Sequence, residues 1–93
     1  GINKDEAVSF TFYDMPLKSV ILLFARTLDL NVVIDPGISG KVTCELKNVQ
    51  WSAAMKYFLK INKLDMIVEG ENNIIRVGRV DVLANEARPR RKL

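Results

Sequence analysis

Residues 12–35 read FYDMPLKSVILLFARTLDLNVVID, and residues 46–69 read LKNVQWSAAMKYFLKINKLDMIVE. At an offset of 34 residues (46 − 12) the two stretches match in apolar character at most positions, and Phe24 falls on Phe58. Two copies are fewer than the three or so that a solenoid needs. The repeat therefore predicts one compact domain made of two similar strand–helix–strand units.

The first unit begins with a strand, because apolar and polar residues alternate across residues 8–12. Pro16 suits the first turn of the helix that follows, and Asp14 is placed to accept a hydrogen bond from a free N–H there. The helix is expected to end near residue 29, and a strand over residues 30–34 closes the unit. Apolar side chains spread well beyond one helical face, so we expect this helix to be covered on more than one side.

The second unit repeats this order. Its first strand contains Val42, Cys44 and Leu46 in alternation with polar residues, and its helix is expected to begin near Ser52. Strands over residues 64–69 and 73–78 complete the order βαββαββ. Two helices that are apolar on both broad sides predict a three-layer α+β plan, with small sheets above and below them.

The chain has 93 residues, of which 48% are apolar and 27% charged, an ordinary balance for one small globular domain. Its net charge of +3 is concentrated at the C-terminus, because residues 88–92 contain four basic side chains and no acidic one. Residues 1–87 contain ten Lys and Arg against eleven Asp and Glu. We therefore expect a nearly neutral domain over residues 1–79 and a charged linker or tail over residues 80–93.

No apolar run approaches the roughly 20 residues that cross a bilayer, and nothing at the start resembles a signal peptide. The chain is therefore expected to be a piece of a larger protein. Histidine is absent, and no carboxylate pair or nucleophile–base set is evident. Cys44 is interpreted as a buried structural thiol. We expect no enzyme activity, no catalytic residue, no cofactor and no metal site.

Gly37-Ile38-Ser39-Gly40 forms a Gly-x-x-Gly loop before Lys41. Some RNA-binding modules clamp a nucleic-acid backbone with such a loop, but they place it between two helices. Here it joins two predicted strands, so a turn is the favoured interpretation. A small nucleic-acid module that uses the basic tail is a remote alternative, since the strand at residues 42–48 lacks outward aromatic side chains for base stacking.

Three segments in order carry a resemblance to a known family. They are Phe-x-Asp-Met-Pro-Leu at residues 12–17, LNVVIDPGISGKVT at residues 30–43, and LKNVQWSAAM at residues 46–55. Over residues 8–79 the chain resembles the short N-terminal (STN) domain shared by secretins and TonB-dependent transducers. The segment at residues 48–51, with Ala54, is most similar to type IV pilus secretins.

The resemblance implies that the helices are sandwiched between a two-stranded and a three-stranded β-sheet. It also implies a non-catalytic periplasmic docking domain of an outer-membrane secretin channel, for type IV pilus biogenesis or protein secretion. The implied partners are an inner-membrane lipoprotein or inner-membrane secretion protein and neighbouring secretin subunits in a ring, with no nucleic acid and no small-molecule substrate. The signalling domain of a TonB-dependent transducer is the alternative, and the segment at residues 48–51 favours the secretin.

Two surfaces are candidates for partner binding. Small sheets leave edges with unpaired backbone groups, to which a partner strand can add. The first surface is the outward side of the two equivalent strands, and the second is a set of aliphatic residues opposite the core-facing positions of the other strands. The predicted partner-binding residues are Ser9, Thr11, Thr43, Glu45 and Lys47 on the first, and Val33, Ile67 and Ile74 on the second.

Overall fold

The computed structural model describes residues 6–69 and 73–87, and the basic residues 88–92 lie outside this part. The βαββαββ order predicted from the sequence is confirmed, and a third helix follows it within the stretch expected to be a tail. The elements are β1 (Ala7–Pro16), α1 (Leu17–Leu28), β2 (Asn31–Ile34), β3 (Lys41–Gln50), α2 (Trp51–Ile61), β4 (Leu64–Glu69), β5 (Ile74–Arg79) and α3 (Val80–Ala87).

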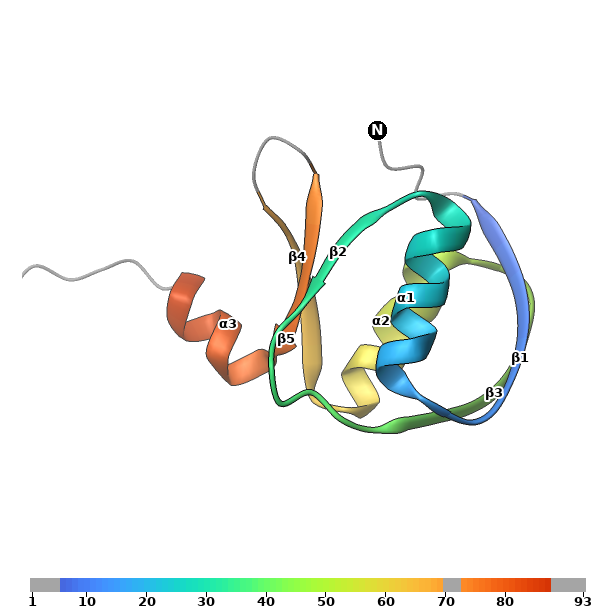
Figure 1. Ribbon diagram of the computed structural model, residues 1–93, viewed down its shortest axis with the longest axis horizontal. Coiled ribbons are helices and arrows are strands. Elements are labelled where there is room, and N and C mark those ends of the chain that lie inside the picture. Colours follow the sequence, from blue (N-terminus) through green and yellow to red (C-terminus); the bar gives the residue numbers. More distant parts are fainter. Residues whose placement is uncertain (1–5, 70–72, 88–93) are drawn as a thin grey trace, which may run out of the picture.

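The layers follow one another across the molecule, as Figure 1 shows. The antiparallel sheet β1-β3 lies on one side of α1 and α2, and the sheet β2-β5-β4 lies on the other. The predicted sandwich of two helices between a two-stranded and a three-stranded sheet is therefore confirmed. The third helix, α3, lies against the outer side of the three-stranded sheet. Within the described residues no helix is long and apolar enough to span a bilayer.

The two-stranded sheet carries the sequence repeat as a pseudo-twofold axis. Thr11 pairs with Glu45, and each is the other's equivalent at the offset of 34 residues. The remaining pairs are exchanged by the same operation, so that Ala7 with Gln50 corresponds to Pro16 with Lys41. The predicted duplication is thus confirmed in the pairing of the strands.

Backbone details repeat as well. Asp14 and Asn48, at equivalent bulges of β1 and β3, adopt φ of 52° and 55°. The residue that ends each helical unit is also left-handed, with φ of 56° at Asp29 and 60° at Lys63. The expected capping role of Asp14 is wrong, because α1 begins after Pro16 without any side-chain cap. The bulge turns the Asp14 carboxylate instead toward Lys41 Nζ, at 3.5 Å.

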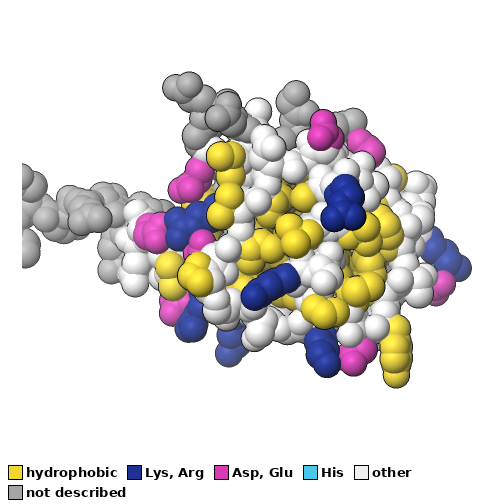
Figure 2. All heavy atoms as spheres, in the orientation of Figure 1, with side chains coloured by type: hydrophobic (Ala, Val, Ile, Leu, Met, Phe, Trp, Pro, Cys, Tyr) yellow, Lys and Arg dark blue, Asp and Glu magenta, His cyan; other side chains and the backbone are white. Residues whose placement is uncertain are grey.

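The core lies between the layers and is built around the equivalent residues Phe24 and Phe58. Their rings meet nearly edge to face, with centroids 5.9 Å apart, and Phe12 of β1 contacts both. Trp51 is buried at the start of α2. The prediction that these aromatic residues build the core is confirmed. On the face where α1 lies in front, hydrophobic side chains remain visible between the layers, with only isolated basic side chains among them (Figure 2).

The Gly-x-x-Gly segment is a connection, as predicted, and it joins strands of different sheets. Ile38 is buried and packs into the core from this loop. Gly37 and Gly40 have φ of 80° and 131°, which side chains disfavour. A Cβ at Gly40 would also clash with the Asn62 side chain. The two glycines therefore serve the geometry of the loop.

Candidate docking surfaces

The first predicted surface, called here the two-stranded face, consists of Ser9, Thr11, Thr43, Glu45 and Lys47. All five residues are exposed. They come from β1 and β3, and the pseudo-twofold axis passes between Thr11 and Glu45 at the centre. The structure therefore places them together on one face, as the alternation in the sequence predicted.

Two members of the two-stranded face have a structural task. The Ser9 Oγ accepts a hydrogen bond of 3.0 Å from the Asn48 backbone N–H, and the Thr43 Oγ1 accepts one of 2.8 Å from the Asp14 N–H. These donors belong to the bulges, where the strand ladder cannot satisfy them. The side chains of Thr11, Glu45 and Lys47 make no comparable bond among those resolved, so they are the better candidates for contact with a partner.

Sequence reasoning missed Tyr13, which is 85% exposed on β1. The strand alternation puts it on the same side as Thr11. An exposed tyrosine supplies contact area and a hydroxyl at low entropic cost, which is typical of binding surfaces. Each strand of this sheet also has one partner only, so the outer edges of both β1 and β3 are unpaired. Two equivalent edges therefore flank the two-stranded face.

The second predicted surface, called here the three-stranded face, consists of Val33, Ile67 and Ile74. Val33 of β2 and Ile67 of β4 flank Arg76 of β5 in one row of the sheet, and Ile74 lies one row away on β5. The three aliphatic residues do share a face. Only Val33 is largely open, at 51% exposed, while Ile67 and Ile74 are half-buried. Arg76 at the centre was not foreseen, so the face is less apolar than expected.

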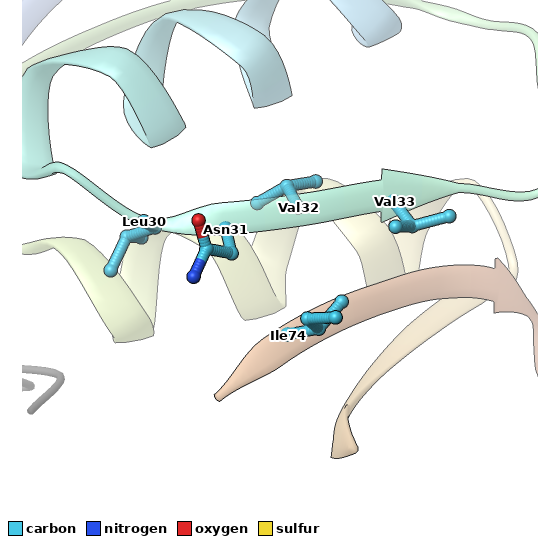
Figure 3. Close-up of a pocket in the computed structure, with 5 residues that line it drawn as sticks. All are labelled: Leu30, Asn31, Val32, Val33 and Ile74. Carbon is cyan, nitrogen blue, oxygen red and sulfur yellow. The ribbon is translucent and has the colours of Figure 1, made fainter. Parts of the chain in front are cut away.

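An open groove runs along the β2 edge next to this face. Figure 3 shows the five lining residues, four from the segment around β2 and Ile74 from the start of β5. Its volume is about 550 Å³. Main-chain groups of the unpaired β2 edge and the Val33 and Ile74 side chains are therefore accessible from the same side.

Arg76 is the strongest electrostatic feature of the described residues. Its Nε and Nη2 donate to the two carboxylate oxygens of Asp35, at 2.9 and 3.0 Å. The same guanidinium donates to both carboxylate oxygens of Glu86 on α3, with Nη2 to Oε2 at 3.0 Å. Hydrogen bonds from Arg76 lower the pKa of both Asp35 and Glu86, and the two carboxylates raise the pKa of Arg76. One cation thus joins β5, the loop after β2, and α3.

The chemistry of the remaining residues is sparse. Burial raises the pKa of the half-buried Cys44 thiol, which disfavours the reactive thiolate. Across residues 6–69 and 73–87 no cluster of three or more His, Cys, Asp or Glu is arranged to hold a metal. The surfaces available on this part of the molecule are suited to binding through sheet edges and faces.

No protein-family model matches the chain. The chain is similar to the fimbrial assembly protein PilQ of Pseudomonas aeruginosa, with 36% identity over 88 residues, which are 95% of this chain and 12% of that protein. It is 29% identical over 76 residues to the type IV pilus biogenesis and competence protein PilQ of Neisseria meningitidis, covering 82% of this chain and 10% of that one. The chain therefore spans only about a tenth of the length of these relatives.

Solved structures show the same fold. The N0 domain of the type II secretin from enterotoxigenic Escherichia coli superposes with a TM-score of 0.68 at 22% identity, covering 81% of this chain and 96% of that one. The N-terminal domain of the secretin XcpQ from Pseudomonas aeruginosa gives a TM-score of 0.65 at 12% identity, over 78% of this chain and 36% of that one. A complex of GspC and GspD from enterotoxigenic Escherichia coli also matches, with a TM-score of 0.62 at 20% identity, over 78% of this chain and 56% of the matched one.

The layered fold and the unpaired sheet edges define the class as an N0-type secretin N-terminal domain, a structural and non-catalytic class. Sequence similarity then places the chain in the PilQ and GspD family of secretins. Such a domain is the periplasmic N-terminal part of an outer-membrane secretin.

Proposed function

We propose that the chain is a docking domain of a secretin channel for type IV pilus biogenesis, with an inner-membrane-anchored lipoprotein as its partner. In this role it also contacts neighbouring secretin subunits in a ring. The observation that carries the proposal is the 36% identity to a fimbrial PilQ over nearly the whole chain. It is supported by the complex of GspC and GspD, in which a chain of the same fold is part of an assembly.

The two-stranded face is the proposed partner site. Both of its edges carry free backbone donors and acceptors, and an added strand gains main-chain hydrogen bonds there. Specificity would come from the outward side chains of Thr11, Glu45 and Lys47, with Tyr13 beside them. Because the Ser9 and Thr43 hydroxyls are engaged by the bulges, they contribute mainly by keeping the strands in shape.

The three-stranded face is the proposed site for a neighbouring subunit. Val33, Ile67 and Ile74 supply apolar contact area, and the groove at the β2 edge supplies an approach to the backbone. Using separate faces for the two partners would let one domain bind both at once.

The proposal is tested by calorimetric titration of the chain with the purified periplasmic part of the lipoprotein from the same pilus system. Glu45→Lys and Lys47→Glu are expected to weaken binding by about 1–2 kcal/mol each, if they lie near the centre of the interface. Arg26→Glu, on the exposed side of α1, is the matched charge-reversal control and should leave the affinity unchanged.

Absence of binding by the unmodified chain would contradict the docking role. Tight binding instead to an anti-sigma regulator would favour the TonB-transducer alternative, which shares the STN domain that the sequence resembles. A loss of affinity in Arg26→Glu alone would move the partner site to the helical side of the domain.

A further inference from the structure

The third helix, α3, is attached to the domain by very few side chains. Of residues 80–86 only Leu83 is buried, at 5% exposed. It covers Gly78 on the outer side of β5, where an added Cβ would lie 3.3 Å from Leu83 Cδ2 and would clash with the Asp35 carboxylate. Gly78 is therefore the floor of a small slot into which Leu83 fits.

A charged contact next to this slot fixes the same helix. Glu86, three residues after Leu83 and thus on the same side of the helix, meets Arg76, which is itself held by Asp35. Arg76 remains anchored through Asp35 whether or not Glu86 is present. The sheet therefore keeps an oriented guanidinium beside the glycine floor, and α3 supplies one apolar and one acidic group to it.

The helix has little stability of its own. Helices shorter than about 12–15 residues are marginal in water, and α3 has eight. It follows β5 directly, with Arg79 and Val80 adjacent, so its position depends on the two contacts described above. A backbone hydrogen bond of 3.1 Å from the Val80 N–H to the Lys63 carbonyl anchors only its first residue.

We propose that α3 is a detachable cover, and that the slot it occupies is a docking site for a helical segment with an apolar residue three positions before an acidic one. The chain itself shows the chemistry of the ligand, because α3 presents Leu83 and Glu86 in this spacing. A partner helix competes with a helix tethered in place, and a tether acts as a high local concentration. The site is therefore open to a partner mainly when α3 has left it.

The slot adjoins the three-stranded face, with Val33 and Ile67 on either side of Arg76. Release of α3 enlarges that face by the Gly78 floor and frees Arg76 for an acidic group. The inference concerns this side of the molecule only. Its failure would leave the proposed role of the two-stranded face standing.

The cover is tested first by amide hydrogen exchange on the whole chain. Leu83→Asp is expected to reduce the protection of the α3 amides by more than about tenfold, because the aspartate cannot fill an apolar slot. Val82→Asp changes the neighbouring exposed side chain of the same helix and should have a much smaller effect. Unchanged protection in β1 and β3 would show that the domain itself stays folded.

The slot is tested second by NMR titration with a synthetic peptide of residues 80–87, VDVLANEA, capped at both ends. In the Leu83→Asp chain the peptide is expected to shift the signals of Gly78 and Arg76. In the unmodified chain the same peptide should act at least about tenfold more weakly, because the site is occupied. A control peptide with Leu83→Ala and Glu86→Gln should shift neither signal.

Full protection of α3 in Leu83→Asp would overturn the idea that Leu83 holds the cover. A peptide that shifts nothing in the variant would overturn the docking site. Equal shifts in the variant and the unmodified chain would place the peptide elsewhere on the surface and would overturn it as well.

Discussion

The two sheets treat the duplicated sequence differently. In the two-stranded sheet the equivalent strands β1 and β3 pair with each other, and every observed pair has its counterpart at the offset of 34 residues. In the three-stranded sheet the equivalent strands β2 and β4 are separated by β5, which has no counterpart in the repeat. The repeat therefore specifies one sheet completely and leaves the other to an added segment.

This difference explains where each kind of surface arises. The two-stranded face is symmetrical in backbone and differs between its halves only in side chains, such as Thr11 against Glu45. The three-stranded face depends on Arg76 and Gly78 of β5 and on the α3 that follows. Features specific to this chain thus collect on residues 74–87, beyond the repeat.

The largest expected effect tests whether the halves share one core. Phe24→Ala and Phe58→Ala are each expected to lower the free energy of unfolding by about 3–5 kcal/mol, because both rings are buried. The rings touch, so the double variant should lose less than the sum of the two single losses. Urea denaturation at constant slope measures all three. Strict additivity would mean that the halves pack independently.

A smaller effect tests the symmetry of the bulges. Ser9→Ala and Thr43→Val each remove an acceptor for a bulge N–H, and each is expected to cost about 0.5–1.5 kcal/mol of folding stability. Because the two hydrogen bonds are equivalent, the losses should agree within a few tenths of a kcal/mol. Thr11→Val, at the centre of the same face, is the control. A loss at only one bulge would show that the repeat is not equivalent in energy.

The smallest effect concerns the charged contact that β5 adds. Hydrogen bonds from Arg76 lower the pKa of Asp35 and Glu86, so both groups bind protons more tightly when α3 is detached. Their contribution to docking is therefore complete above about pH 5, and it is lost as the pH falls below about 4, through the lowered pKa values.

An acid titration followed by the NMR signals of Gly78 and Leu83 measures this release. Glu86→Gln should remove much of the acid dependence while leaving Leu83 in place at neutral pH. Asp81→Asn, which alters only the exposed pair with Arg79, is the control and should titrate like the unmodified chain. Signals of Gly78 that do not move in acid would contradict a role of the charged contact in holding α3.

Much of the fold was predictable because the repeat and the alternation of apolar residues fix which side chains face the core. The five members of the two-stranded face followed from the same alternation. The role of Asp14 did not, because a bulge with positive φ is set by the pairing of distant strands. Arg76 was likewise missed, since its partners Asp35 and Glu86 are distant in sequence and meet only in the folded chain.

The third helix was missed for a related reason. Residues 80–87 carry only one apolar side chain that becomes buried, so the segment shows little of the helical stripe that predicted α1 and α2. Its position depends on a glycine in a strand, which offers room for Leu83 only once the sheet has formed. The domain boundary expected at residue 79 stays a prediction.

The most direct test of the docking role is a map of the bound surface. Amide NMR signals of the chain are followed while the periplasmic part of the pilus lipoprotein is added. The account predicts the largest shifts at Thr11, Glu45 and Lys47 and along one outer edge of β1 or β3. Shifts confined to the outward sides of α1 and α2, with the two-stranded face unchanged, would contradict it.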